Sequence, residues 1–360
     1  MKAFLRAKKT FYLKLVKKID LMKVRSIIIK FLALTITFLA ILLLIACIVP
    51  YIPVKRVPSL SILSLVFPVL VMINLVILVF CFFLSKKHLV VPLFALVVAF
   101  LTLGSFYKIN FLEKAPVVEE GFEIMSFNVR SFNSYSSLND TSIGDKIIAF
   151  LKDETPDILC LQEHNRTWGK QLKNYPYKAE SPYPKKLKRS TQVIFSKYPI
   201  ISNGSLDFPN TANNCIYADI LYKNDTIRVY NMHLQSYKVR SVSRETSNKL
   251  LGKFNNAIKK QEEQAQLFLK HAKTSHFKTI VCADFNNSQF SRTYRMVKGD
   301  MKDTYQEKGV GFGMTYEKMK FPFRIDYILV DNSFNVMSHK NYKIKLSDHY
   351  PITSTLDLKD

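Results

Sequence analysis

Polar side chains follow four apolar, strand-like runs of this sequence. The runs are "FEIMSF", "DILCLQ", "IRVYNM" and "TIVCA", and the residues that follow them are Asn128, Glu163, His233, and Asp284 with Asn286. A strand holds its Cα atoms in place while a terminal side chain leaves the core, so several such ends can line a rigid polar cleft. Carboxylate, amide and imidazole groups in one cleft suit the binding of a metal ion or a phosphate.

Two more acids belong to this set. Asp326 lies inside "RIDYILV", and Asp348 adjoins His349 in "KLSDHYPI". A carboxylate in an apolar strand is costly unless a cation or an imidazole pairs with it, so His349 is the predicted partner of Asp326. Neighbouring side chains of an extended chain point to opposite faces. Asp348 is therefore predicted to face a metal ion and Glu163 while His349 faces the phosphate.

The elements that must position these residues begin at Phe122. From there the chain consists of runs of four to eight residues rich in Ile, Val, Phe, Tyr and Leu, separated by turns, which is typical of strands. Helical spacing of apolar residues predicts helices over 141–153 and about 245–272. Many strands with few interposed helices predict an α+β fold, with a two-sheet core covered by helices, rather than a Rossmann sheet.

Six motifs in order resemble those of the endonuclease/exonuclease/phosphatase superfamily. They are "SFNVR", "LQEHN", "NMHLQ", "CADFNN", "RIDYIL" and "SDHYPI", spread over about residues 122–358. Each motif alone could be an ordinary turn after a strand, but six in this order are a specific signal. The resemblance implies a four-layered α/β sandwich, with two mostly antiparallel sheets flanked by helices, that hydrolyses phosphate esters with Mg²⁺ or Mn²⁺.

The resemblance also implies a role for each residue of the set. Three residues would bind the metal ion: Asn128, Glu163 and Asp348. Five would act on the water and the phosphate: His233, Asp284, Asn286, Asp326 and His349. Asp284 would be the base, and Asp326 would orient His349. Oxygen ligands suit a hard divalent ion that lowers the pKa of a bound water, so the chemistry of these residue types agrees with the resemblance.

Two further predictions concern residues to which the resemblance gives no role. Gln192, in "STQVIFSKYPI", stands where the family usually has a small residue, which leaves the local fit of a substrate open. Four histidines correspond to no functional position of the motifs and are expected to face solvent: His164, His271, His276 and His339.

Three long apolar runs precede the strands: 27–49, 60–84 and 89–107. The first covers roughly 30 Å as a helix, which is the thickness of a bilayer core. Buried helices of soluble domains rarely run past about 18 residues without a charge, so about three transmembrane helices are predicted. The predicted organisation is a basic cytoplasmic segment (1–26), a membrane domain (27–107), a linker (108–121) and a catalytic domain (122–360).

The charge around the first run predicts the orientation. Residues 1–30 contain ten Lys and Arg and one acid, which places this end in the cytoplasm by the positive-inside rule. Three spans then leave the catalytic domain outside the cytoplasm, in the inner membrane of a bacterium. If the third run does not span, the domain faces the cytoplasm instead.

The net charge and the cysteine content restrict the possible functions less than the motifs do. The net charge is +24, to which residues 1–113 contribute 15 basic and two acidic side chains, leaving +11 for the rest. This excess suits any anionic substrate, either nucleic acid or a lipid headgroup. The five cysteines show no zinc-ligand spacing, and buried free thiols are expected at Cys160, Cys215 and Cys282.

These observations predict a membrane-anchored, metal-dependent phosphoesterase that acts on phosphodiester or phosphomonoester bonds. The alternative is a non-catalytic membrane protein that binds phosphate ligands. A channel or transporter subunit is disfavoured because the spans contain no acid. No protein partner can be inferred, and contacts to an anionic substrate are expected from three basic residues near His233: Lys238, Arg240 and Arg244.

Overall fold

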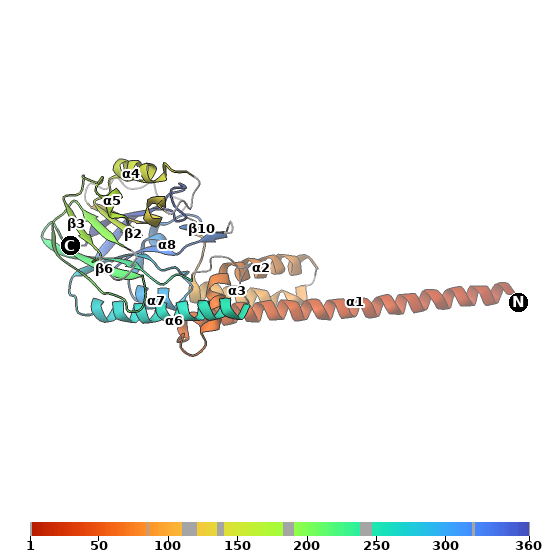
Figure 1. Ribbon diagram of the computed structural model, residues 1–360. Coiled ribbons are helices and arrows are strands. Elements are labelled where there is room, and N and C mark those ends of the chain that lie inside the picture. Colours follow the sequence, from red (N-terminus) through yellow and green to blue (C-terminus); the bar gives the residue numbers. More distant parts are fainter. Residues whose placement is uncertain are drawn as a thin grey trace. The chain divides into compact units, whose positions relative to one another are not determined.

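The computed structural model describes residues 2–84, 86–109, 121–134, 140–182, 191–237, 247–318 and 321–359 (Figure 1). The chain divides into two compact units. The first consists of Met1–Ile48 and Val66–Gly104, and the second of Val49–Leu65 and Ser105–Asp360.

The first unit is helical. Its helices are α1 (Lys2–Ile48), α2 (Ile62–Leu84) and α3 (Val90–Leu103). Three segments are long and apolar enough to cross a membrane, namely Met22–Tyr51, Pro58–Phe83 and Lys86–Leu103. The buried amide of Asn74 on α2 donates to the backbone carbonyl oxygens of Leu70 at 2.9 Å and of Leu39 on α1 at 3.3 Å, so it links two of the apolar helices.

The second unit contains two six-stranded sheets and a separate hairpin. In spatial order, the strands of the first sheet are β13 (Phe334–Asn341), β14 (Ile352–Leu358), β1 (Phe122–Asn128), β2 (Ile158–Gln162), β4 (Val193–Ser196) and β3 (Tyr177–Glu180). Those of the second sheet are β5 (Ile200–Ser205), β6 (Asn214–Tyr222), β7 (Asp225–His233), β8 (Lys278–Asp284), β12 (Asp326–Val330) and β9 (Lys302–Asp303). The hairpin pairs β10 (Tyr316–Lys318) with β11 (Phe321–Phe323).

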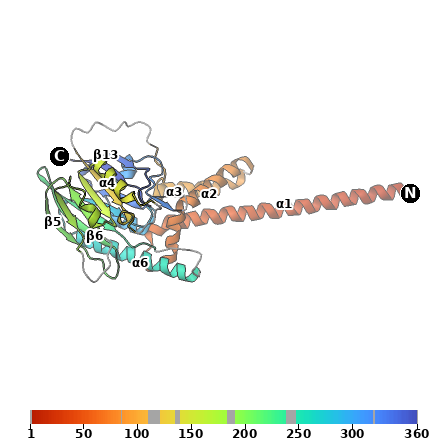
Figure 2. The same cartoon turned by 45° about the horizontal axis from the view of Figure 1, so that its top comes forward.

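Five helices accompany these sheets in the described residues: α4 (Ile143–Glu154), α5 (Arg166–Gly169), α6 (Ser247–Ala272), α7 (Arg292–Lys298) and α8 (Thr304–Lys308). Figure 1 shows α4 on one side of the strands and α6 with α7 on the other, and Figure 2 shows β5 and β6 side by side in their sheet. The predicted helices over 141–153 and about 245–272 are thus present as α4 and α6.

Alternation along the strands explains the layers. On β1, Phe122 and Ile124 face the core between the two sheets, whereas Met125 and Phe127 face α4. A third apolar cluster joins the outer face of the second sheet to α6 and α7. The order of layers is helix, sheet, sheet, helices, which confirms the predicted α+β sandwich.

Each sheet contains a single parallel pair of strands, and these pairs bring the site together. β1 pairs with β2 in parallel, and β7 pairs with β8 so that His233 lies opposite Asp284. Parallel neighbours place their carboxyl ends at the same edge of a sheet. β12 runs antiparallel to β8, so its first residue, Asp326, also lies opposite Asp284. Strand ends far apart in the sequence therefore meet at one edge of the sandwich.

A buried amide network joins the two sheets directly behind this edge. The Asn231 side chain on β7 donates to the backbone carbonyl oxygens of Leu161 and Val193, both at 2.9 Å, and accepts from Gln162 Nε2 at 2.9 Å. Gln192 Nε2 donates to the carbonyl oxygens of Asn214 at 2.6 Å and Asn231 at 3.3 Å. Gln192 is thus part of the packing between the sheets.

We expect Asn231→Ala to lower the free energy of unfolding by about 2–4 kcal/mol, because it leaves buried polar partners unpaired. For a domain of this size, that loss corresponds to a melting point lower by about 5–10 °C. The fluorescence of Trp168, the sole tryptophan, can follow unfolding of the full chain in detergent. Asn203→Ala, at an exposed position of β5, is the control. Equal melting points of the two variants would contradict the prediction.

Candidate active site

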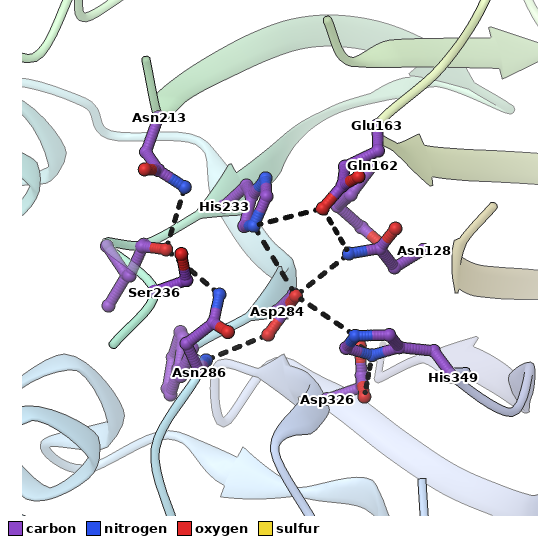
Figure 3. Close-up of polar contacts among 12 residues, drawn as sticks. Asn128, Gln162, Glu163, Asn213, His233, Ser236, Asp284, Asn286, Asp326 and His349 are labelled. Carbon is purple, nitrogen blue, oxygen red and sulfur yellow. Dashed lines mark hydrogen bonds and ion pairs between the residues drawn. The ribbon is translucent and has the colours of Figure 1, made fainter. Parts of the chain in front are cut away.

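The buried carboxylate of Asp284, the last residue of β8, is the centre of the site (Figure 3). Its Oδ2 accepts a hydrogen bond from Asn128 Nδ2 at 2.9 Å and lies 3.5 Å from His233 Nε2 and 3.7 Å from His349 Nε2. Its Oδ1 accepts the backbone N–H of Asn286 at 2.8 Å. Residues predicted from four separate motifs therefore surround a single carboxylate.

Glu163 follows β2 with its backbone in the left-handed region, at φ +48°. This conformation is unfavourable for a residue with a side chain, and such strain is often found at functional sites. Its Oε1 lies 3.4 Å from Asn128 Nδ2 and 3.9 Å from His233 Nε2. The side chain is 34% exposed, against 5% for His233. The Glu163 carboxylate is thus open to a ligand from outside.

Asp326 and His349 form a buried pair, as the sequence predicts. His349 Nδ1 lies 2.9 Å and 3.1 Å from the two carboxylate oxygens of Asp326. Burial raises the pKa of Asp326. Burial alone would lower the pKa of His349, but the charges of Asp326 and Asp284 outweigh it and raise that pKa. Asp326 therefore orients the His349 imidazole so that its Nε2 faces Asp284, and the raised pKa favours the protonated ring.

Asp348 has a different partner. Its Oδ2 pairs with Arg130 Nη1 at 2.5 Å, and Ser347 Oγ donates to its Oδ1 at 3.3 Å. Adjacent residues Asp348 and His349 thus contact different groups, as alternation along the chain predicts. Within the described residues, the partners of the Asp348 carboxylate do not include Glu163 or Asn128, so its role as a metal ligand stays a prediction.

Arg130 is a site residue that the sequence reasoning did not single out. Its backbone N–H donates to Asn128 Oδ1 at 3.0 Å, and the next residue, Ser131, donates its N–H to the carbonyl oxygen of Glu163 at 2.7 Å. All four residues 130–133 have positive φ, so this turn ties the end of β1 to that of β2. The guanidinium is 37% exposed beside the acids, where it can bind a phosphate oxygen. Its signal was its place in "SFNVR", two residues after Asn128.

The expectation that His164 faces solvent is wrong. Its ring is buried against the rings of Phe132 and Phe195, 3.4 Å from a carboxylate oxygen of Glu180, and burial lowers its pKa. The ring points inward because it packs against the rings of Phe132 and Phe195, and this packing cannot be predicted from the residues next to His164 in the sequence.

The other three histidines outside the motifs differ from one another. His271 and His339 are partly buried and bond the hydroxyl groups of Tyr230 and Thr304, whereas His276 is exposed. Three basic residues predicted to contact the substrate lie outside the described residues: Lys238, Arg240 and Arg244.

The donor groups fit a hard divalent cation. Asp284, Asp326 and His349 each offer one ligand atom, and these atoms lie within 4.8 Å of one another. Since Asp326 and His349 already satisfy each other, Asp284 and the open Glu163 are the carboxylates left for an ion. Carboxylate and amide oxygens are the ligands that Mg²⁺ and Mn²⁺ prefer.

Two family models match parts of the chain. A family model described as the Endonuclease/Exonuclease/phosphatase family matches residues 125–349, a range that contains all eight predicted site residues. A second family model, described as a domain of unknown function, matches residues 28–106. No curated protein sequence matches the chain.

Solved structures share the fold of the second unit. An endonuclease/exonuclease/phosphatase from Bacteroides vulgatus superposes with a TM-score of 0.51 at 18% identity, covering 67% of this chain and 100% of that one. The human nocturnin catalytic domain with bound sulfate gives 0.51 at 15% identity, covering 68% and 95%. A mannosyl-6-phosphatase from Bacteroides thetaiotaomicron gives 0.50 at 17% identity, covering 66% and 100%. At these identities, the likeness shows the fold.

Proposed function

Because the chain belongs to the Endonuclease/Exonuclease/phosphatase family, we propose that it is a membrane-anchored phosphoesterase that uses Mg²⁺ or Mn²⁺ to hydrolyse phosphodiester or phosphomonoester bonds. The observation that carries this proposal is the convergence of side chains from both sheets on Asp284. A base, two imidazoles and an open carboxylate in one place are the groups that ester hydrolysis requires.

In the proposed mechanism, Asp284 accepts a proton from the attacking water as the water oxygen bonds to phosphorus. The ester P–O bond breaks, and His233 is placed to give a proton to the leaving oxygen. Protonated His349, held by Asp326, donates a hydrogen bond to a phosphate oxygen. A divalent ion held by Glu163 and Asn128 would neutralise charge on the phosphate and acidify a bound water.

The proposed location follows from the charges that flank the apolar helices. Ten basic residues among 1–30 support a cytoplasmic N-terminus, and three spans would place the catalytic domain on the other side of a bacterial inner membrane. The division into a basic segment, a membrane domain, a linker and a catalytic domain also stays a proposal. Substrates compatible with the site are phosphate esters of nucleic acids or of lipid headgroups.

Removal of divalent metal is expected to lower turnover of bis-p-nitrophenyl phosphate or p-nitrophenyl phosphate by at least about 100-fold. The physical reason is that water and phosphate would lose a cation worth several kcal/mol of transition-state stabilisation. The assay uses the full chain in detergent, treated with EDTA and then given Mg²⁺ or Mn²⁺.

Restoration of activity by either ion is the expected second half of this result. Activity that resists EDTA would contradict the metal requirement. Absence of turnover with every phosphate ester, in the presence of either ion, would instead favour a non-catalytic phosphate-binding protein.

A further inference from the structure

The connection between the first two apolar helices packs on the catalytic domain within the second unit. Tyr51, the last residue of the first candidate span, lies with its ring 3.8 Å from the guanidinium of Arg295, and its carbonyl oxygen accepts from Arg292 Nη1 at 3.3 Å. The backbone N–H of buried Val54 donates to Glu262 Oε2 at 3.0 Å, while Glu262 Oε1 accepts from Arg292 Nε at 2.7 Å. A partly buried ion pair thus fixes this connection to α6 and α7.

The other two candidate spans attach at the same place. The carbonyl oxygen of Ser64, near the start of the second span, accepts from Ser288 Oγ at 2.8 Å. Ser105, two residues after α3, accepts through its carbonyl oxygen from Gln289 Nε2 at 3.3 Å. Tyr51 at the end of the first span, Ser64 near the start of the second and Ser105 just after the third therefore all contact residues 288–295.

This convergence is what three consecutive crossings require. A chain that crosses up, down and up brings those three points out on the same side of the membrane. If the three segments span a bilayer, residues next to their ends lie close to its surface, and the stretch 288–295 that they contact would lie there as well. That stretch begins two residues after Asn286, which is at most about 7 Å of chain.

An exposed apolar surface lies beside the exit of the third span. We call it the apolar rim: Phe106, Tyr107, Ile109, Val310 and Phe312. The ring of Phe312 stacks on Phe106 at 6.0 Å and meets Tyr107 edge-on at 4.8 Å. Paired backbone hydrogen bonds of 2.8 Å between Lys108 and Gly311 hold the two segments together.

Four of the five rim side chains are exposed although they are apolar, and Phe106 is half-buried. Val310 and Ile109 are 62% and 63% exposed, and Phe312 and Tyr107 are 45% and 44% exposed. Contiguous apolar side chains on a surface mark a site of association, and aromatic side chains at the end of a span are typical of the membrane–water interface. The rim is also close to the site along the chain. Tyr316 follows Phe312 by four residues, and its ring lies 4.8 Å from the ring of His349.

We propose that the apolar rim sits in the interface of the bilayer that the chain spans, and that the substrate is a phosphate ester of a lipid in that leaflet. This inference rests on the proposed function. Two attachments support it: residues 288–295 bring Asn286 to the bilayer surface, and the rim brings Tyr316 and His349 there. Lys108 is the one charged residue in the two segments that carry the rim (106–109 and 310–312), whereas a surface for nucleic acid needs several basic contacts to phosphates.

Insertion of the rim is tested by fluorescence. In a Trp168→Phe background, Phe312→Trp is introduced into the full chain, which is reconstituted in phosphatidylcholine nanodiscs with brominated acyl chains. The matched control is Phe277→Trp, which replaces a 41% exposed residue just before β8, at the opposite end of that strand from Asp284. We expect bromine to quench the tryptophan at 312 and not the one at 277. Equal quenching at both positions, or none at 312, would overturn the inference.

The substrate class is tested in the same nanodiscs, doped in turn with phosphatidic acid, phosphatidylglycerol and a phosphoinositide, in the presence of Mg²⁺. Release of phosphate or headgroup is compared with turnover of bis-p-nitrophenyl phosphate and plasmid DNA. We expect turnover of at least one lipid. The double variant V310S/F312S is expected to lower the ratio of lipid to soluble turnover about tenfold, because the site loses its placement at the interface. The control F277S keeps the ratio of the unmodified chain.

The outcomes separate this inference from the proposed function. Turnover of bis-p-nitrophenyl phosphate or plasmid DNA without turnover of any lipid would overturn the lipid substrate and leave the phosphoesterase intact. Failure to turn over any phosphate ester, lipid or soluble, would overturn both.

Discussion

Asp284→Asn is expected to lower kcat by about 10³-fold, the range that follows the loss of a general base. The variant keeps the shape of the side chain but cannot accept a proton from water. It also removes the buried negative charge that faces the Nε2 atoms of His233 and His349, at 3.5 Å and 3.7 Å. Steady-state rates on bis-p-nitrophenyl phosphate with saturating Mg²⁺ measure the effect.

The matched control for this variant is Asp300→Asn, at an exposed position after α7. It makes the same chemical change away from the site and should leave kcat within twofold of the unmodified chain. The Trp168 melting curve checks that the fold of both variants is retained. A folded Asp284→Asn variant with more than about a tenth of the original kcat would exclude Asp284 as the base.

Glu163→Gln is expected to lower kcat/KM by about 10³-fold at low Mg²⁺, with partial recovery as Mg²⁺ is raised. The reason is that Glu163 is the most open of the carboxylates around Asp284, and a neutral amide binds a hard cation more weakly than a carboxylate does. The measurement is the dependence of the rate on Mg²⁺ concentration. Glu263→Gln, an exposed substitution on α6, is the control.

The two variants are expected to differ in their response to metal. Excess Mg²⁺ should recover part of the activity of Glu163→Gln and none of that of Asp284→Asn, because a proton acceptor cannot be replaced by more cation. Recovery of both variants would show that Asp284 acts mainly as a ligand. Recovery of neither would place Glu163 in the proton transfer rather than on the metal.

Much of the fold was predictable because local patterns determine the type of an element. The helices over residues 143–154 and 247–272 follow from apolar spacing, and the strands that end in Asn128, His233 and Asp284 follow from apolar runs. The sequence did not reveal β5 or β13. Both lie at the edge of a sheet and carry polar, partly exposed residues, so their apolar signal is weak.

The membership of the candidate site was largely predictable, but its geometry was not. The pairing of Asp326 with His349 followed from the cost of burying an acid alone. In contrast, the sequence did not indicate that Arg130 belongs to the site. Its place there depends on a left-handed turn that brings its guanidinium to Asp348. His164 was misplaced for a similar reason, since its burial depends on the rings of Phe132 and Phe195, which come from distant strands and turns.

The sequence by itself determined the candidate site residues and the helices that are apolar enough to span a membrane, because residue types and their local spacing indicate both. Only the tertiary structure decided that Asp284 is the centre of the site and that three span ends meet at residues 288–295. Those facts depend on which strands pair in parallel and on hydrogen bonds between residues up to 241 positions apart. Local sequence patterns do not encode such long-range pairing, since the same strand can pair with several others until the whole core is packed.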